Sequence, residues 1–330
     1  MARVKNVSDP TPPNNCLTEA EFPELPNFYR GKVRDAYGLP DGRRLLISTD
    51  RQSAFDQVLA AVPYKGQVLT QTARFWFEQT EDICPNHVIS YPDPNVVLVK
   101  DLKMLPIEMV VRDYLTGSTE TSIWPMYERG ERVLYGHRLP DRLRKNQKLP
   151  ETIITPTTKA EQGDHDEPIT EAEILETELV TADHWRQLRD LSLAIFARGR
   201  DIAAKYGLIL VDTKFEFGLD DSGAVVVADE ILTPDSSRYW IADTYAAKIE
   251  AGENPESLDK EFLRLWIAAR CDPYKDPIPE IPAETIAEFS GKYIDLYEQV
   301  TGQLFEKPDI ATSVQERIRA ALKSELPQYF

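Results

Sequence analysis

Residues 208–238 read LILVDTKFEFGLDDSGAVVVADEILTPDSSR and hold two apolar runs separated by a short polar turn. In the first run, Asp212, Lys214 and Glu216 alternate with apolar residues and threonine. Because a strand directs successive side chains to opposite faces, one face of this strand presents acid, base and acid in a row. The turn at 218–223 then predicts an antiparallel hairpin.

The second run of the hairpin ends in two carboxylates, Asp229 and Glu230, directly after three valines and an alanine. Unpaired carboxylates are costly to bury, and they usually lie beside cations or metals. Mg²⁺ is commonly held by one or two carboxylates together with substrate phosphates. A divalent cation at this hairpin is therefore our first functional hypothesis.

A hairpin with one solvated face is the alternative, because most alternating strands belong to such sheets. The continuous apolar run 208–211 argues against it, since such a run indicates cover on both faces. In a simple register Asp212 lies near Asp229, and like charges that face each other destabilise a sheet. Lys214 and a divalent cation would neutralise that pair.

The composition excludes several classes of protein. The 330 residues carry 38 basic and 55 acidic side chains, which give a net charge of −17. This charge disfavours nucleic acid as the main partner, although a local basic pocket could still bind a nucleotide. No apolar run approaches the roughly 20 residues of a membrane span, and the N-terminus lacks a signal-peptide core. Cys16, Cys84 and Cys271 are too few and too far apart for a disulfide framework or a zinc site, so we expect a cytoplasmic location.

The chain length suggests about two domains. Residues 1–26 are rich in proline and are expected to form an extended arm. Residues 27–115 are expected to form a β-rich lobe with one helix near 69–77, and residues 116–330 a larger α+β lobe. Strands are predicted at 44–49, 96–100 and 108–114.

The second half of the chain carries clear helix signals. Capping boxes at 170–173 and 313–316 mark two helix starts. Helices are predicted from Thr170 to Gly207, near 258–269, near 283–301 and after Ser313. The polar segment 117–168, punctuated by Pro and Gly, is expected to be a long loop with a functional role.

The segment GKVRD at 31–35 precedes a strand and is a candidate phosphate site. Gly31 permits close backbone approach, and Lys32 and Arg34 can bind phosphate oxygens. The spacing is not that of a Walker A loop. A surface turn is the alternative, and when the segment is considered by itself the surface turn is favoured.

The segment TDRQSAFD at 49–56 follows a strand end. Asp50, Arg51 and Ser53 place several polar groups in a tight loop, which suits a binding site. The start of a helix explains the same residues equally well.

The segment VVRDYLTGS at 110–118 places an arginine just beyond an apolar strand, before a Gly-Ser turn. Arg112 and Ser118 would offer a phosphate a bidentate fork and a hydroxyl. A surface ion pair between Arg112 and Asp113 is the alternative.

Two further polar segments are candidates. Lys159 leads to the DHDE cluster at 164–167, which could bind a metal, but its adjacent residues lack ligand spacing and a mobile polar loop is favoured. In the segment 233–238, Arg238 is placed to bind an anion near the proposed metal. Asp235 could bind hydroxyl groups or cap the turn.

Six motifs in this order resemble the SAICAR synthetase family of purine biosynthesis. They are GKVRD, TDRQSAFD, VVRDYLTGS, TPTTKAEQGDHDE, DTKFEFG and DEILTPDSSRYW, and they span Gly31 to Trp240. SLDKEFLRLW and KYIDLYE extend the likeness toward Gln299. Six ordered motifs are far more specific than any one of them. The compact single-function form is expected, because no second catalytic domain is attached.

The resemblance implies an ATP-dependent ligase that joins the carboxylate of carboxyaminoimidazole ribotide (CAIR) to the amine of L-aspartate, giving SAICAR, ADP and phosphate. A carboxylate resists amine attack because oxide is a poor leaving group. Phosphoryl transfer from ATP creates a good one, and such transfer needs mainly positioning and charge neutralisation, with Mg²⁺ as the cofactor. A small-molecule kinase on the same scaffold and a non-catalytic nucleotide-binding protein are the alternatives.

The resemblance also implies an ATP site and a catalytic group. The ATP-binding residues are Gly31, Lys32, Arg34, Glu108, Glu216 and Asp229. Glu216 and Asp229 would hold Mg²⁺. Lys214, with Asp212 as its partner, would act at the reacting carboxylate and the γ-phosphate, and Lys32 is the third catalytic candidate. Adenine is expected between the lobes, near a connection at 104–108.

On the substrate side, the resemblance assigns Arg112, Ser118 and Arg238 to the 5′-phosphate of CAIR and Asp235 to its polar groups. The residues expected near the remaining substrate groups are Asp50, Arg51, Ser53, Lys159 and Asp166. Asp113 stands where the family pattern leads us to expect Gly or Asn. The segment after Ser118, TETSIW, also departs from the family pattern.

The family's fold is α+β and two-lobed, with an antiparallel, kinase-like N-terminal lobe packed on a larger lobe that resembles ATP-grasp enzymes. The expected partners are ATP, CAIR and L-aspartate, without nucleic acid or membrane. The oligomeric state stays open, with a monomer as one option.

Overall fold

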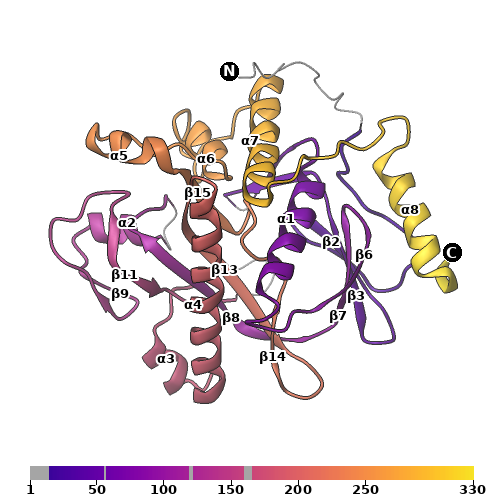
Figure 1. Ribbon diagram of the computed structural model, residues 1–330, viewed down its shortest axis with the longest axis horizontal. Coiled ribbons are helices and arrows are strands. Elements are labelled where there is room, and N and C mark those ends of the chain that lie inside the picture. Colours follow the sequence, from indigo (N-terminus) through magenta and orange to yellow (C-terminus); the bar gives the residue numbers. More distant parts are fainter. Residues whose placement is uncertain (1–14, 56, 119–121, 160–165) are drawn as a thin grey trace.

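The computed structural model describes residues 15–55, 57–118, 122–159 and 166–330. Two antiparallel sheets form the two lobes of this part of the chain, and helices pack between and around them (Figure 1). This two-lobed α+β architecture confirms the predicted fold class. None of the described helices has the length and apolar character needed to span a lipid bilayer.

The first sheet has the strand order β1-β2-β3-β7-β6. Its strands are β1 (Phe28–Arg30), β2 (Arg34–Gly38), β3 (Arg43–Ser48), β7 (Val96–Lys100) and β6 (Val88–Asp93). The predictions of strands at 44–49 and 96–100 are confirmed by β3 and β7. A separate pair, β4 (Arg51–Ala54) and β5 (Gln57–Ala61), follows β3, so the helix start considered at 49–56 is wrong.

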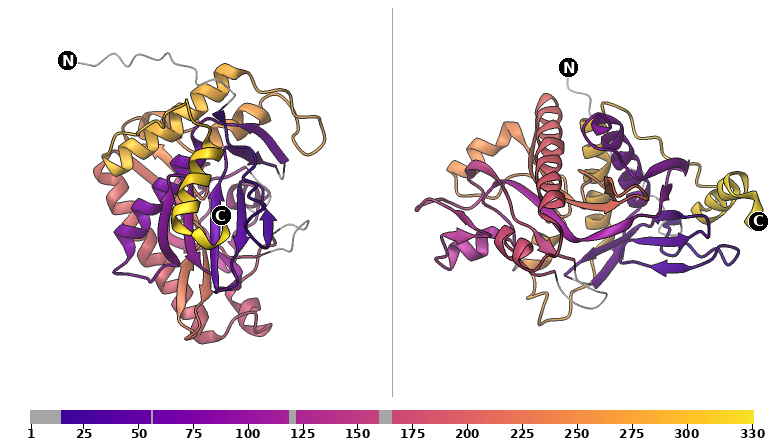
Figure 2. Two further views of the ribbon diagram at one scale, coloured as in Figure 1. Left: turned by 90° about the vertical axis from the view of Figure 1, so that its right-hand side faces the viewer. Right: turned by 90° about the horizontal axis from the view of Figure 1, so that it is seen from below.

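One face of the first sheet is covered by segments from both ends of the described chain. Helix α8 (Val314–Glu325) packs there together with the segment 17–25, and Figure 2 shows it against the indigo strands. Arg317 Nε of α8 lies 2.9 Å from Asp93 Oδ2 at the end of β6. The buried side chains of this cluster include Leu17, Phe22, Leu25, Leu45, Ile47, Leu98, Ile318 and Leu322. The capping box predicted at 313–316 is confirmed.

The second sheet has the order β11-β8-β13-β14, with β12 paired to β8 and β15 paired to β13. Its strands are β8 (Lys103–Tyr114), β11 (Lys148–Ile154), β12 (Thr157–Thr158), β13 (Leu208–Leu219), β14 (Val225–Ala228) and β15 (Ser237–Ile241). The hairpin predicted from 208–238 is therefore confirmed as β13 and β14. Helix α4 (Ala182–Lys205) covers one face of this sheet, and Leu188 and Phe196 belong to the same buried apolar cluster as Phe215 and Phe217.

The helix expected from Thr170 to Gly207 is two helices, α3 (Glu171–Glu176) and α4. Thr170 and Glu173 form the predicted capping box of α3, and Thr181 caps α4 separately. The expectation of an irregular loop at 117–168 is wrong. This segment contains α2 (Ile123–Glu128), β9 (Val133–Leu134), β10 (His137–Arg138), β11 and β12, and an apolar cluster that includes Leu134 and Ile153 holds part of it together.

A third apolar cluster joins helices that are distant in sequence. Helix α1 (Lys65–Thr80) confirms the helix near 69–77, and it packs against α7 (Ala283–Thr301) and α4. Helix α6 (Glu261–Ala268) lies in the same cluster through Leu263 and Ile267. The helices predicted near 258–269 and 283–301 are thus confirmed, whereas α5 (Ala242–Glu250) was not predicted.

The predicted domain limits remain a prediction, and two elements cross them. β8 lies within 27–115 but pairs with β13 of the second sheet. Helix α8 lies within 116–330 but packs on the first sheet. The two lobes also meet where Val227 of β14 bridges to Asn86, just before β6.

Candidate active site

The charged face of β13 lies between two neighbouring strands, β8 and β15, that also carry charged side chains. Asp212 is opposite Arg112 of β8 and Arg238 of β15, and Glu216 is opposite Glu108 of β8. The other face of β13 points Phe215 and Phe217 into the core. The alternation read from the sequence is therefore correct, and the apolar face explains why the charged face can be held rigidly.

Two arginines converge on Asp212. Arg112 Nη1 and Arg238 Nη1 lie 2.9 Å and 2.6 Å from the same atom, Asp212 Oδ2. The simple register that placed Asp212 near Asp229 is wrong, because β14 pairs only with residues 216–219 of β13. The expected pairing of Asp212 with Lys214 is also not seen, because Asp212 takes its cations, Arg112 and Arg238, from the adjacent strands.

Lys214 is held instead by carboxylates on its own face of the sheet. Its Nζ hydrogen-bonds to Glu108 and lies 3.1 Å from Glu216 Oε1, while Lys159 forms an ion pair with the other oxygen of Glu216. Burial alone lowers the pKa of Lys214, but the charges of Glu216 and Glu108 outweigh it and raise the pKa. Burial raises the pKa of Glu216, but Lys214 and Lys159 bring it down to about 2. The two carboxylates therefore favour the protonated, cationic form of Lys214.

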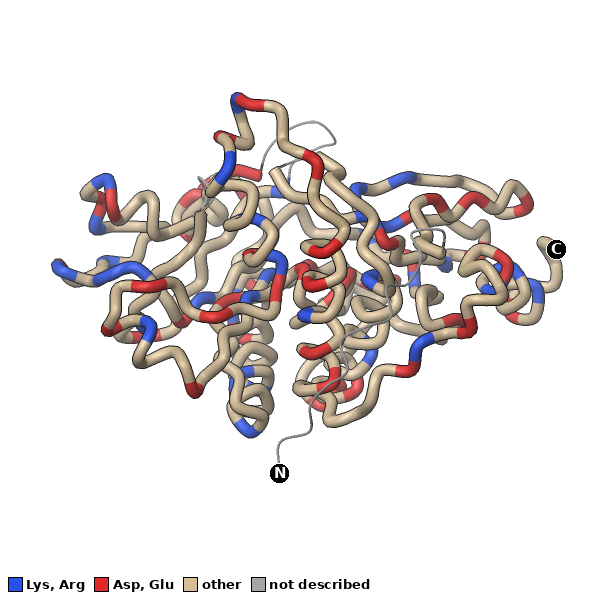
Figure 3. The backbone as a smooth tube through the Cα atoms, turned by 90° about the horizontal axis from the view of Figure 1, so that it is seen from above, with Lys and Arg blue, Asp and Glu red and all other residues tan. Residues whose placement is uncertain are grey.

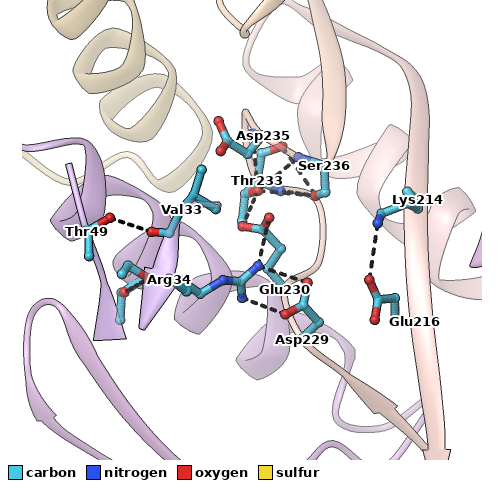
Figure 4. Close-up of polar contacts among 12 residues, drawn as sticks. Val33, Arg34, Thr49, Lys214, Glu216, Asp229, Glu230, Thr233, Asp235 and Ser236 are labelled. Carbon is cyan, nitrogen blue, oxygen red and sulfur yellow. Dashed lines mark hydrogen bonds and ion pairs between the residues drawn. The ribbon is translucent and has the colours of Figure 1, made fainter. Parts of the chain in front are cut away.

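Asp229 follows β14 directly and adopts a left-handed backbone conformation, with φ of 61°. Arg34 Nη1 lies 2.8 Å from Asp229 Oδ1, and Arg34 Nη2 lies 3.1 Å from Glu230 Oε1. Figure 4 shows Asp229 turned toward Arg34, with Glu216 on the neighbouring strand. Because Glu216 is opposite Ala228, the residue before Asp229, the two predicted metal carboxylates lie on adjacent segments of the sheet.

The GKVRD segment forms a tight turn before β2. The Gly31 amide donates to the Arg34 carbonyl at 2.8 Å, and a Cβ at Gly31 would lie 2.9 Å from that oxygen. Arg51 Nη2 donates to the Gly31 carbonyl at 2.9 Å, Arg51 Nε donates to the Lys32 carbonyl at 3.1 Å, and Arg51 also pairs with Asp35. The buried side chain of Arg51 therefore holds the backbone of this turn in place.

Asp50 also belongs to the framework. Asp50 accepts hydrogen bonds from the amides of Leu17 at 2.7 Å and Gly66 at 2.9 Å. Its carboxylate thereby connects the N-terminal segment to the start of α1. Ser53 lies on β4, opposite Val58. The structure thus places Asp50 and Arg51 in the packing around the GKVRD turn.

A cavity of about 150 Å³ lies beside the charged face of β13. Its lining residues are Val110, Arg112, Ser122, Asp212, Thr213, Lys214, Asp235, Ser236, Ser237, Arg238, Lys260 and Arg264. Five of them are basic and two are acidic, so the cavity favours an anion although the whole chain is acidic. Figure 3 shows that acidic and basic residues are otherwise interspersed along the chain.

Ser118 lies at the edge of this group and donates to Glu261 Oε1 at 2.9 Å. Arg238 Nη2 and Arg264 Nη1 each lie 3.5 Å from Glu261 Oε2. The preceding glycine, Gly117, has φ of 109°, and a Cβ there would lie 2.3 Å from Ser122. A larger residue at 117 would therefore displace the turn that presents Ser118.

Comparison with known proteins decides the family. The family model for SAICAR synthetase matches residues 27–281. The chain is 50% identical to a phosphoribosylaminoimidazole-succinocarboxamide synthase of Legionella pneumophila over 304 residues, which are 92% of this chain and 96% of that protein. This chain belongs to the SAICAR synthetase family.

Solved structures agree with the assignment to the SAICAR synthetase family. A SAICAR synthase from Saccharomyces cerevisiae, complexed with SAICAR, superposes with a TM-score of 0.76 at 32% identity, covering 88% of this chain and all of that one. A SAICAR synthetase in complex with ADP gives a TM-score of 0.65 at 26% identity, over 85% of this chain and 100% of that one. The enzyme is an ATP-dependent ligase of purine biosynthesis that joins CAIR and L-aspartate, and the kinase alternative is not favoured.

Several residues of this SAICAR synthetase site were not predicted. Lys260 and Arg264 line the cavity, and their spacing of four residues at the start of an amphipathic helix was a usable signal. Burial lowers the pKa of Lys260 to about 8, and Arg264 acts in the same direction. Lys65 and Tyr293 contact Asp235 from α1 and α7, and no local pattern marks either of them.

Other expectations are corrected or fall outside the described residues. Residues 104–108 form part of β8 and not a connection between elements. Asp113 points away from Arg112, toward Thr152 and Arg200, so the unusual residue does not touch the arginine cluster. Asp166 is described and exposed, whereas residues 164 and 165 of the DHDE cluster lie outside the described part.

Proposed function

We propose that the cavity binds CAIR and that ATP binds between the GKVRD turn and the end of the β13–β14 hairpin. The observation that carries this proposal is the cavity of about 150 Å³, which has Lys214 among its lining residues together with Arg112 and Arg238. A phosphate-bearing carboxylate would meet two arginines and a lysine there. Such a set of fixed cations suits both the 5′-phosphate and the reacting carboxylate.

Mg²⁺ fits the residues near the proposed ATP site. Glu216 and Asp229 offer hard oxygen donors on adjacent segments, and two carboxylates plus phosphate oxygens are a typical Mg²⁺ environment. Among the described residues, no group of three or more His, Cys, Asp and Glu side chains is placed to hold a metal by itself. The phosphates are therefore expected to supply the remaining ligands. When bound, Mg²⁺ would neutralise charge on the transferred phosphoryl group.

The ATP phosphates would lie against the Gly31 turn, with Lys32 and Arg34 as their cations. Arg34 already pairs with Asp229 and Glu230, so it links the turn to the metal carboxylates. Glu108 of β8 lies beside Lys214 of β13. The first half of β8 would border adenine.

Lys214 would orient the CAIR carboxylate toward the γ-phosphate. Because the charges of Glu216 and Glu108 raise its pKa, the ammonium stays protonated and neutralises the two anions that must approach each other. Carboxylate attack on the phosphoryl group would release ADP, and the amine of L-aspartate would then displace phosphate from the activated carboxyl carbon. Asp212 would act through Arg112 and Arg238 and not through Lys214.

The 5′-phosphate of CAIR would bind Arg112, Ser118 and Arg238, with Lys260 and Arg264 adding positive charge. For L-aspartate we retain Lys159 and Asp166 as the proposed neighbours. Asp50 and Arg51 are 2% and 7% exposed and hydrogen-bonded within the framework, so for them we propose support of the turn in place of substrate contact. Ser53 stays a proposed substrate neighbour.

The test is an assay with purified protein, ATP, Mg²⁺, CAIR and L-aspartate in which both products, SAICAR and ADP, are quantified. SAICAR, followed by its absorbance, and ADP, followed by a coupled assay, should form in equal amounts. Omission of L-aspartate should stop SAICAR formation and reduce ADP formation strongly. Steady ADP release with a phosphorylated product and no need for an amine would instead support a kinase.

We also propose that the enzyme is monomeric and works in the cytoplasm. A related plant enzyme, from Arabidopsis thaliana, is named as chloroplastic, so location differs among relatives. Light scattering of the purified protein tests the oligomeric state directly.

A further inference from the structure

A lysine with no exposed surface contacts a carboxylate that lines the cavity. Lys65 is the first residue of α1 and is 0% exposed, and its Nζ lies 2.7 Å from Asp235 Oδ2. Tyr293 of α7, also 0% exposed, donates its hydroxyl to Asp235 Oδ1 at 2.6 Å. The two oxygens of one cavity-lining carboxylate are thus each held by a separate helix.

The surroundings fix both groups in place. The Gly66 amide donates to Asp50, and a Cβ at Gly66 would lie 2.2 Å from the Ser48 carbonyl oxygen, so the first turn of α1 sits tightly on the framework. Ser290 Oγ of α7 donates to the Pro63 carbonyl at 2.7 Å, just before α1. Neither helix end can move far without breaking these contacts.

Stability alone is a weak reason for this arrangement. A buried ion pair often contributes no more than well-packed apolar residues of the same size, because both charges lose their hydration. Apolar side chains of α1 and α7, among them Val68, Leu69 and Phe289, could have filled this space without a charge. A lysine at this position therefore points to a role in controlling Asp235.

The contacts determine what Asp235 can do. Burial raises the pKa of Asp235, but Lys65 and Lys260 outweigh it and lower the pKa to about 2. An ionised carboxylate has about four acceptor sites, of which Lys65 and Tyr293 take two. Because Asp235 lines the cavity, its remaining sites can accept from an O–H or N–H group of a ligand that enters there.

We infer that Lys65 and Tyr293 are positioning residues that hold Asp235 as a fixed hydrogen-bond acceptor for an O–H or N–H donor of the nucleotide substrate. This inference rests on the proposed function of the cavity. CAIR carries such donors on its ribose and on its amine. Asp235 thereby selects a donor-bearing part of the substrate, while the arginines select its phosphate.

The first test removes one hydroxyl group. Tyr293→Phe deletes the contact to Asp235 and keeps the ring that packs against Phe289. Tyr297→Phe, one turn later on α7, is the matched control, because its hydroxyl bonds to Gln303 and not to Asp235. We expect the KM for CAIR to rise about tenfold in Tyr293→Phe, with kcat within about twofold of wild type. Tyr297→Phe should leave both values near wild type. If the Tyr293 hydroxyl served stability alone, Tyr293→Phe would lower Tm without a selective change in this KM.

The second test removes the charge pair. Lys65→Met alone leaves Asp235 buried without its cation, so this variant can fail to fold. Lys65→Met combined with Asp235→Asn gives a neutral pair of similar volume that should fold. This double variant should bind CAIR about tenfold or more weakly than wild type, as measured by calorimetry.

The outcomes separate the two proposals. Lack of CAIR binding to the wild-type protein contradicts the proposed function. If wild type binds CAIR, equal affinity in wild type, Tyr293→Phe and the double variant overturns the positioning role. A rise in the KM for ATP of the same size as that for CAIR overturns it as well, because Asp235 would then act on the site as a whole.

Discussion

Arg112 and Arg238 donate to a single oxygen atom, Asp212 Oδ2, from strands on opposite sides of β13. Two guanidinium groups that approach one another repel, and the shared carboxylate offsets that repulsion. Because each arginine has five N–H donors, both keep donors for another anion. The sheet thus presents a two-armed anion site whose spacing is set by the strand pairing.

The first prediction concerns the shared carboxylate. Asp212→Asn should remove the shared counter-charge of two buried guanidinium groups, of which only Arg238 keeps another carboxylate, Glu261, and this is expected to lower the free energy of unfolding by about 3 kcal/mol. The KM for CAIR should rise about tenfold, because the two arginines lose their common anchor. Urea unfolding and steady-state kinetics measure these two effects. Asp221→Asn, at the exposed tip of the β13–β14 turn, is the control and should change neither. Unchanged stability in Asp212→Asn would contradict the buried pairing.

The second prediction concerns the proposed metal carboxylates. Asp229→Asn should reduce kcat about 10²-fold, the scale for losing one preorganised electrostatic group. The Mg²⁺ concentration that gives half-maximal rate should rise, and CAIR binding without nucleotide should stay near wild type. Rate measurements across a Mg²⁺ series, with Asp221→Asn alongside, make the comparison. Near-normal rates at every Mg²⁺ concentration would remove Asp229 from the metal site.

The third prediction is a pH dependence. Burial lowers the pKa of Lys260 from 10.5 to about 8, so its positive charge is lost above that pH in the free enzyme. The KM for CAIR should therefore rise as pH increases beyond 8, and Lys260→Arg should remove that rise because arginine stays protonated. Lys145→Arg, at an exposed position, is the control and should keep the wild-type profile.

The lowered pKa of Lys260 also makes the free energy of unfolding depend on pH. Between pH 8 and 10.5 the unfolded chain keeps the Lys260 proton that the folded chain has lost. The contribution of Lys260 to the free energy of unfolding should therefore increase with pH across this window. Comparing wild type and Lys260→Arg by urea unfolding at several pH values isolates it. An equal pH slope in both proteins would show that Lys260 titrates normally.

The fourth prediction concerns the GKVRD turn. Gly31→Ala puts a methyl group 2.9 Å from the Arg34 carbonyl oxygen, so the turn must open. A strain of about 1 kcal/mol corresponds to a rise of about fivefold in the KM for ATP. Gly291→Ala is the control, because its Cβ meets nothing within 4 Å on α7 and helical Ala is favoured over Gly. Equal KM values for ATP in Gly31→Ala and wild type would show that the turn does not bind the phosphates.

Local patterns predicted the elements of this fold well, because their signals lie within a few neighbouring residues. The alternation at 211–217 indicated both the strand and its charged face. Capping boxes located the starts of α3 and α8 correctly. The segment 117–168 was misread because its strands are short and its polar residues hide them.

Pairing between distant segments was harder to predict. The hairpin register was wrong because β14 has only four residues and β13 continues for twelve, so most of β13 pairs with β8 and β15 instead. Lys65 could not be assigned to the site, since 170 positions separate it from Asp235. Such contacts depend on how helices pack in three dimensions, and the residues next to Lys65 carry no signal for that packing.

The packing of α8 on the first sheet has a consequence for folding during translation. A ribosome releases the chain from its N-terminus, so the strands of the first sheet emerge long before α8 exists. Until α8 arrives, Leu45, Ile47 and Leu98 lack part of their apolar cover. The nascent first lobe should therefore be a client for chaperones, and it should reach its protease-resistant form only after translation of residues 314–325.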